Sequence, residues 1–90
     1  MSFQWDERKA KANLKKHGVS FEEASTVFRD PGLRLLSDMG HSVEEERFAA
    51  IGSSRLLRTL VVSYCYRGDV IRIISARKAA PSEVKQHFGD

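Results

Sequence analysis

The segment FQWDERKAKANLKKHGVSFEEA, residues 3–24, contains the local signals that decide how this chain folds. It opens with a short β-like run, turns at Asp6 into a basic helix, and stops at Gly18. Asp6 is a favoured helix N-cap, and glycine readily takes the left-handed conformation that ends a helix. Ser20 then starts a second helix, and Glu23 completes a capping box with it. The segment predicts a strand followed by two helices.

The second helix has an apolar face at helical spacing, formed by Phe21, Ala24, Val27 and Phe28. Such a face is typical of a helix that packs on a core. The helix is expected to end at residues 30–32, where Asp-Pro-Gly cannot continue the backbone hydrogen bonds.

Most of the remaining chain alternates between β-rich runs and turn residues. The predicted strands after the helices are residues 33–37, 47–52, 58–66 and 70–77. Their short connections, including a polar turn at 38–42 and a hairpin at 67–69, predict antiparallel neighbours. Pro81 is expected to begin a short terminal helix. The predicted fold is a single α+β domain over 1–90 with the order β-α-α-β-β-β-β-α: a small antiparallel sheet with two N-terminal helices packed on one face and a short C-terminal helix.

Composition favours an ordinary soluble domain. The 90 residues are 41% hydrophobic and 30% charged, and the formal net charge is +3. Lys and Arg residues are concentrated at 8–16, 55–58 and 72–78. This clustering, more than the small net charge, indicates a polyanionic partner. The single cysteine, Cys65, fits a reducing compartment and a packing role. No signal peptide or apolar run of about 20 residues is evident, so we expect a cytoplasmic protein with no membrane contact.

The familiar catalytic motifs are absent, and the three histidines lack metal-ligand spacing, so neither a metal nor a cofactor is predicted. The residues that remain suit metal-independent RNA cleavage, in which the 2′-hydroxyl attacks phosphorus and cations hold the developing charge. Arg47, Arg72 and Arg77, in or beside predicted strands, are the candidate cations. Strict alternation puts Arg72 and Arg77 on opposite faces, unless the strand bulges near Ser75 or ends before Arg77.

His17 is the candidate proton donor or acceptor, although a histidine at a helix C-terminus is equally consistent with a purely structural role. Contacts to RNA are predicted for Lys9, Arg58, Tyr64 and Lys78. A basic helix is more often a solvated face, and a strand tyrosine is more often part of a core than a stacking platform for bases. His41 is expected to be solvated in a polar loop.

Three motifs together resemble the BrnT toxins: residues 5–24, Glu46-Arg47-Phe48-x-x-Ile51-Gly52, and Ile73-Ile74-Ser75-Ala76-Arg77-Lys78-Ala79. The resemblance implies a RelE-like fold and a ribonuclease that inhibits translation as the toxin of a type II toxin–antitoxin system. It also implies a BrnA antitoxin with a ribbon-helix-helix part, which forms a hetero-oligomer with the toxin and alone contacts operator DNA. Arg47 and Arg77 fall on family motif positions, whereas Arg72 is inferred from strand placement.

Two other functions are compatible with the same residues. A non-enzymatic nucleic-acid-binding module would use the basic clusters only to hold a backbone. A protein-interaction module would act by occluding another protein. RNA cleavage that persists in EDTA distinguishes the enzyme from both.

Overall fold

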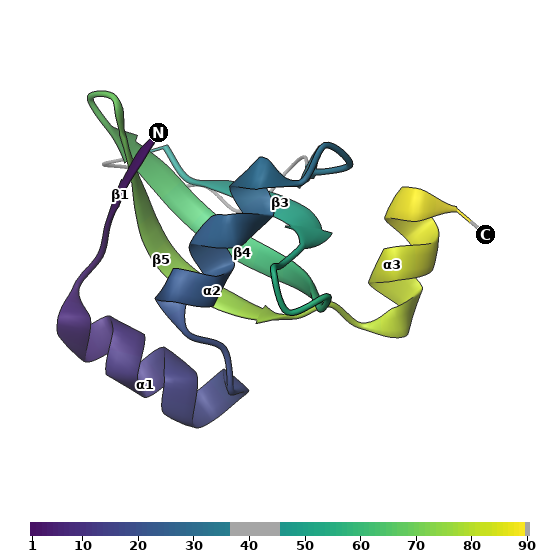
Figure 1. The fold of residues 1–90 in the computed structure, drawn as a ribbon, viewed down its shortest axis with the longest axis horizontal. Helices are drawn as coiled ribbons and strands as arrows, with labels where there is room; N and C mark the ends of the chain where they lie inside the picture. Colours follow the sequence, from purple (N-terminus) through teal and green to yellow (C-terminus); the bar gives the residue numbers. More distant parts are fainter. Residues whose placement is uncertain (37–45, 90) are drawn as a thin grey trace.

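The computed structural model describes residues 1–36 and 46–89. The predicted turn at 38–42, with His41, lies outside the described residues. Figure 1 shows the arrangement of the elements. In chain order they are β1 (Ser2–Gln4), α1 (Glu7–His17), α2 (Phe21–Ser25), the 3₁₀ helix η1 (Thr26–Arg29), β2 (Arg34–Leu36), β3 (Phe48–Ser53), β4 (Thr59–Arg67), β5 (Val70–Lys78) and α3 (Pro81–Phe88). The predicted α+β class and element order are confirmed.

The five strands form one sheet in the order β1-β5-β4-β3-β2. Strands β2 to β5 pair antiparallel, as their short connections predict, but β1 lies parallel to β5. The predicted antiparallel sheet is therefore wrong in this detail, and the sheet is mixed. The turn argument applies only to strands joined by short connections, and the partner of β1 comes from the other end of the chain.

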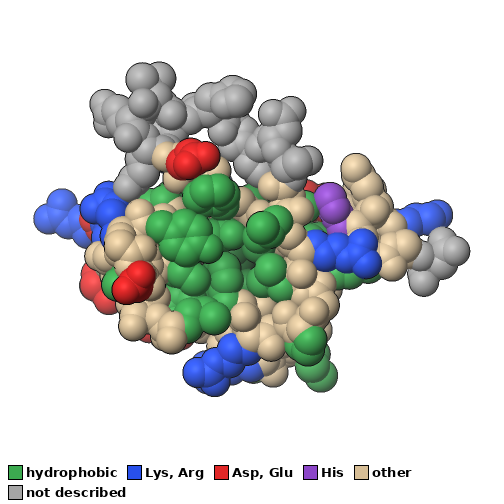
Figure 2. All heavy atoms as spheres, turned by 90° about the horizontal axis from the view of Figure 1, so that it is seen from above, with side chains coloured by type: hydrophobic (Ala, Val, Ile, Leu, Met, Phe, Trp, Pro, Cys, Tyr) green, Lys and Arg blue, Asp and Glu red, His purple; other side chains and the backbone are tan. Residues whose placement is uncertain are grey.

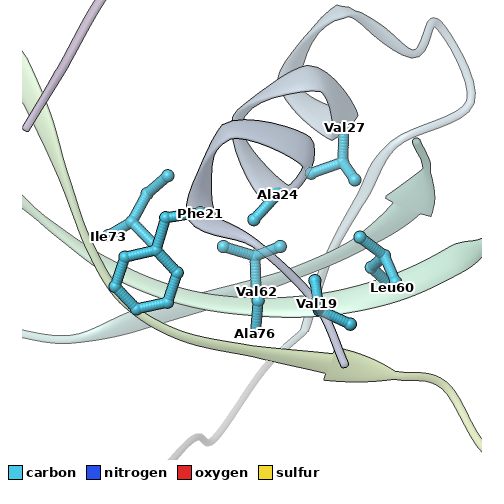
Figure 3. Packing of buried hydrophobic residues seen from close by; sticks show 8 residues of the cluster. All are labelled: Val19, Phe21, Ala24, Val27, Leu60, Val62, Ile73 and Ala76. Carbon is cyan, nitrogen blue, oxygen red and sulfur yellow. The ribbon is translucent and has the colours of Figure 1, made fainter. Parts of the chain in front are cut away.

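The two N-terminal helices cover one face of the sheet, as predicted. Figure 3 shows Phe21 and Ala24 of α2 above Val62 of β4 and Ile73 of β5, all of them buried. Helix α2 is shorter than predicted, because the chain tightens into η1 from Thr26 onward. Phe28 consequently lies half-buried beside the core and not within it.

The opposite face carries a second apolar cluster that belongs to α3. Ala49, Ile51 and Val61 are buried there, and Phe88 of α3 packs against them. Arg34 of β2 lies over the Phe88 ring, 5.4 Å from its centre. The short C-terminal helix therefore covers part of the face that α1 and α2 leave free.

The side chain of Asn13 in α1 makes the hydrogen bonds that a neighbouring strand would make at the free edge of β5. Strand β1 pairs only with the beginning of β5, up to Arg72. Further along, the Asn13 side chain accepts from the Ala76 N–H at 3.1 Å and donates to the Ala76 carbonyl at 2.8 Å. It also donates to the Val19 carbonyl at 2.9 Å. One buried amide thus satisfies backbone groups of the sheet and of the α1–α2 connection.

Local capping agrees with the sequence, with one exception. Asp6 accepts from two amides of the first turn of α1, and Gly18 ends that helix at φ 70°. The Ser20 hydroxyl accepts from the Glu23 N–H at 3.0 Å. Glu23 does not return this bond as a capping box requires, because its carboxylate is bonded to Ser54 and Arg58 instead.

Candidate functional site

A β-bulge in β5 decides where the candidate arginines point. Ser63 of β4 pairs with Ser75, but the next residue of β4, Tyr64, pairs with Ile73. One residue of β5 is therefore skipped in the register, so the residues beyond it point to the opposite face from the one that strict alternation predicts. As a result Arg72 and Arg77, whose partners Cys65 and Val61 are four residues apart on β4, share one face of the sheet. Of the two predicted exceptions to strict alternation, the bulge near Ser75 is the correct one, because β5 continues past Arg77 to Lys78.

Arg77 is positioned by α3. Its guanidinium donates to both carboxylate oxygens of Glu83, at 2.7 and 2.8 Å, and one of its nitrogens also donates to the Lys78 carbonyl at 3.4 Å. The Ala80 N–H donates to the same Glu83 carboxylate. The bonds from Arg77 and from Ala80 lower the pKa of Glu83 to about 2. Two of the five N–H donors of Arg77 remain available for a phosphate.

This ion pair predicts a specific loss of stability in acid. Glu83 has an ordinary pKa of 4.5 and a folded pKa of about 2, so its contribution is complete above pH 4.5 and disappears as the pH falls toward 2. We expect Glu83→Gln to lose less stability than the wild type across this interval, measured by urea unfolding. Glu22→Gln, at an exposed carboxylate, is the control and should follow the wild type. Parallel curves for wild type and Glu83→Gln would contradict the assignment.

A cationic groove lies between α1 and β5, at the bulge. It has a volume of about 230 Å³ and is lined by Lys9, Ala12, Asn13, Lys16, His17, Ile74 and Ser75. Lys9, Lys16 and His17 supply its titratable groups, and none of them has an ion-pair partner within the described part of the chain. The predicted residues His17 and Lys9 are therefore brought together, beside a strand that carries Arg72 and Arg77.

Arg47 lies near the other end of the sheet, just before β3. It is exposed and directly precedes Phe48, the partner of Tyr64 on β4. Arg72, which donates to the Gln4 side chain at 3.0 Å, pairs with the neighbouring Cys65. Arg77 lies about 13 Å further along the sheet, since its partner Val61 is four residues from Cys65 on β4 at roughly 3.3 Å per residue. Arg47 thus lies at the level of Arg72, several residues along the sheet from Arg77.

Two of the residues predicted to contact RNA, Arg58 and Tyr64, make contacts within the protein instead. Arg58 forms an ion pair with buried Glu23 and donates to the Gly18 carbonyl at 3.1 Å, so it ties β4 to both helices. Tyr64 is only 2% exposed, and burial, with the neighbouring Tyr66, raises its pKa to about 12. Its ring is not accessible for stacking, which corrects that prediction. Lys78 is exposed at the end of β5.

Tyr66, which strand alternation predicts on the same face as Tyr64, is the accessible member of an aromatic cluster. Its ring contacts those of Tyr64 and Phe48 at 5.8 and 5.6 Å, and it is 53% exposed. Figure 2 shows hydrophobic side chains gathered in the middle of one side of the molecule, with Lys and Arg at its margins. Tyr64 and Tyr66 share a face of β4, and Tyr66 is the more exposed because it lies nearer the end of the strand.

Among the residues that the structure describes, no three His, Cys, Asp or Glu side chains are grouped so as to hold a metal ion. None of the described helices has the length and apolar character needed to cross a bilayer.

Comparisons with known proteins were made for sequence and for fold. A family model described as the ribonuclease toxin BrnT of type II toxin–antitoxin systems matches residues 5–83. The 1.1 Å crystal structure of the Brucella abortus ribonuclease toxin BrnT is similar, with a TM-score of 0.69 and 25% sequence identity. The likeness covers 89% of this chain and 97% of the Brucella chain. No curated protein matches the chain.

Proposed function

Since the chain belongs to the BrnT family of ribonuclease toxins of type II toxin–antitoxin systems, we propose that it cleaves RNA without a metal ion and thereby inhibits translation. The observation that carries this proposal is the groove between α1 and β5, which is lined by basic side chains of α1 that form no ion pair among the described residues. Lys9, Lys16 and His17 line the groove beside the bulge, and Arg77 lies two residues beyond Ser75. A bulge next to a functional strand end is a common means of aiming side chains.

Cleavage proceeds by attack of the ribose 2′-oxygen on the adjacent phosphorus. A 2′-O–P bond forms as the P–O5′ bond breaks, so the products are a 2′,3′-cyclic phosphate and a 5′-hydroxyl. The 2′-hydroxyl loses a proton and the leaving 5′-oxygen gains one, and histidine is suited to such transfers near neutrality. We assign one of these two transfers, as acceptor or donor, to His17 and the other to water, and the stabilisation of charge on the phosphoryl oxygens to Arg77, whose planar fork suits them.

The remaining cations position the strand of RNA. Arg47, just before β3, and Arg72 of β5 hold phosphates away from the cleaved bond, and Lys9 and Lys78 add charge along the same path. Such contacts contribute binding that is sensitive to salt and independent of base sequence.

His17→Gln is expected to slow cleavage by about 10²-fold and to flatten its pH dependence between mild acid and neutrality, because glutamine neither takes nor gives a proton. The measurement is single-turnover cleavage of a defined RNA across that pH range. Lys16→Gln removes a neighbouring charge without removing the proton carrier, so its rate should keep the wild-type pH profile. A His17→Gln profile of unchanged shape would assign the proton transfer to another group.

The family implies a protein antitoxin, and we propose that it is a BrnA-like ribbon-helix-helix protein. Its toxin-facing surface should be acidic opposite Arg47, Arg72, Arg77 and Lys78, since pairing these cations would hide the RNA site. The toxin then reaches operator DNA only as part of a hetero-oligomer with this antitoxin. Action on cellular RNA places the complex in the cytoplasm.

Growth of cells that express the chain tests this function. Expression alone should arrest growth, and co-expression of the small protein encoded beside it should relieve the arrest. An Arg77→Ala variant of equal abundance serves as the control and should be tolerated. Normal growth of cells that contain abundant, folded and unpartnered wild-type protein would contradict the toxin assignment.

A further inference from the structure

The loop between β3 and β4 is held rigidly by hydrogen bonds. The Ser54 N–H donates to the Arg58 carbonyl at 2.8 Å, and the Leu57 N–H donates to the Ser54 carbonyl at 2.9 Å. The buried Ser54 hydroxyl donates to Glu23 at 2.7 Å, and the same carboxylate binds Arg58. These bonds fix both ends of the loop to α2.

A further contact fixes the middle of the loop. The Arg55 N–H donates to the Thr26 hydroxyl of η1 at 2.9 Å. The Leu56 N–H donates to the Ser54 hydroxyl at 3.2 Å. The backbone of residues 54–58 is therefore anchored to two elements, and little conformational freedom remains to be lost when something binds it.

This rigid loop presents two leucines to solvent. Leu56 is 58% exposed and Leu57 is 88% exposed. Leu57 also has a φ of 61°, and it is the one described residue other than glycine with positive φ. A β-carbon makes that conformation unfavourable, and glycine or asparagine is the usual residue there. The hydrogen bonds of the loop account for this backbone conformation, but the stability of the free chain does not explain why a leucine occupies the position.

The location of the loop relates it to the proposed RNA site. Leu60, which follows the loop, pairs with Lys78, and the Ala79 N–H donates to the Thr59 carbonyl at 2.9 Å. Figure 1 shows the β3–β4 connection at the end of the sheet where β5 leads toward α3. A partner seated on the loop is therefore next to the end of β5 that carries Arg77.

The chemistry of the loop favours a protein as its occupant. Leucine has no charge for a phosphate and no ring for a base, which are the groups that bind RNA. A protein can receive both leucines in an apolar pocket, and exposed apolar side chains on a rigid support are effective anchors. Arg55, which has no ion pair among the described residues, favours acidic groups at the rim of that pocket.

We propose that residues 55–57 form a docking knob for the antitoxin, which receives Leu56 and Leu57 in an apolar pocket with an acidic rim. This inference rests on the proposed toxin function, and it adds an apolar anchor to the pairing of cations on β5. The strained backbone at Leu57 is kept because the side chain is needed in the complex.

Substitution of the leucines tests the knob. Leu57→Gly should leave the urea midpoint of the free chain unchanged or raised, because the strain is relieved, and RNA cleavage should be unaltered. The affinity for the purified protein encoded beside the toxin, measured by titration calorimetry, should fall at least tenfold. Leu56→Ser should weaken binding in the same direction. Leu14→Gln, at another exposed leucine on α1, is the matched control and should bind like the wild type.

Three results would overturn the proposal. Wild-type affinity of both loop variants would show that the antitoxin docks elsewhere. A free chain that dimerises, and whose dimer is broken by the same substitutions, would make the loop a self-interface. If the wild type binds no neighbouring protein at all, the antitoxin part of the proposed function fails and the docking site fails with it.

Discussion

Arg77→Ala is expected to reduce the rate of RNA cleavage by on the order of 10²–10³. The guanidinium is proposed to stabilise charge that develops on the phosphoryl oxygens, an interaction stronger in the transition state than in the ground state. Glu83 fixes its orientation through two hydrogen bonds, and two N–H donors remain for the phosphate. Arg77→Lys should rescue poorly, because an ammonium keeps the charge but not the planar fork. Single-turnover cleavage of a defined RNA by folded variants is the measurement.

Two controls separate catalysis from other effects. Glu83→Gln removes the ion pair and one of its two hydrogen bonds but retains Arg77, so it should keep most of the activity if the arginine acts directly. Arg29→Ala removes an exposed arginine from η1 and should be neutral. Arg47→Ala and Arg72→Ala should raise the RNA concentration that gives the half-maximal rate more than they lower the maximal rate. Both residues lie along the sheet from Arg77, away from the cleaved bond. Wild-type rates for Arg77→Ala would move the site to that end.

Asn13→Leu is expected to lower the free energy of unfolding by roughly 3–5 kcal/mol. Leucine has a similar volume but leaves the Ala76 N–H, the Ala76 carbonyl and the Val19 carbonyl without their partner. Each buried backbone group that loses its hydrogen bond costs about 1–3 kcal/mol. Urea unfolding measures the difference. Lys11→Gln, at an exposed position of the same helix, should change stability by less than about 0.5 kcal/mol. An equally small effect of Asn13→Leu would mean that water or a shifted helix replaces the amide.

The features predicted correctly from sequence are those whose causes are local. Asp6, Gly18 and Ser20 act through backbone groups within three or four residues, and Gly68 makes its turn with a φ of 61° between adjacent strands. The alternation of side chains along a strand correctly predicts that Tyr64 and Tyr66 share one face of β4. These interactions require nothing from the rest of the fold.

The features missed from sequence depend on contacts between distant segments. Glu23 satisfies the spacing of a capping box, but Arg58, 35 residues away, binds its carboxylate more strongly than a backbone amide. The role of Asn13 cannot be read from its own helix, because its partner Ala76 is 63 residues away. The parallel pairing of β1 with β5 has the same origin.

The candidate site was predicted only in part for a similar reason. The sequence identified the arginines of β5, but the register shift that puts both on one face arises from the pairing of β4 with β5. It grouped Arg47 with Arg77, although the two lie at different levels of the sheet. Leu57 left no sequence signal, since its left-handed backbone is imposed by bonds from Ser54 and Arg58.

Cleavage of a defined RNA by the purified protein in the presence of EDTA tests the central claim most directly. Cleavage should persist, its products should carry 2′,3′-cyclic phosphate and 5′-hydroxyl ends, and a 2′-deoxy substitution at the cleaved position should abolish it. The Arg77→Ala protein, purified identically, excludes a contaminating nuclease. Loss of cleavage in EDTA with recovery on addition of magnesium, or cleavage of the deoxy-substituted site, would contradict the account.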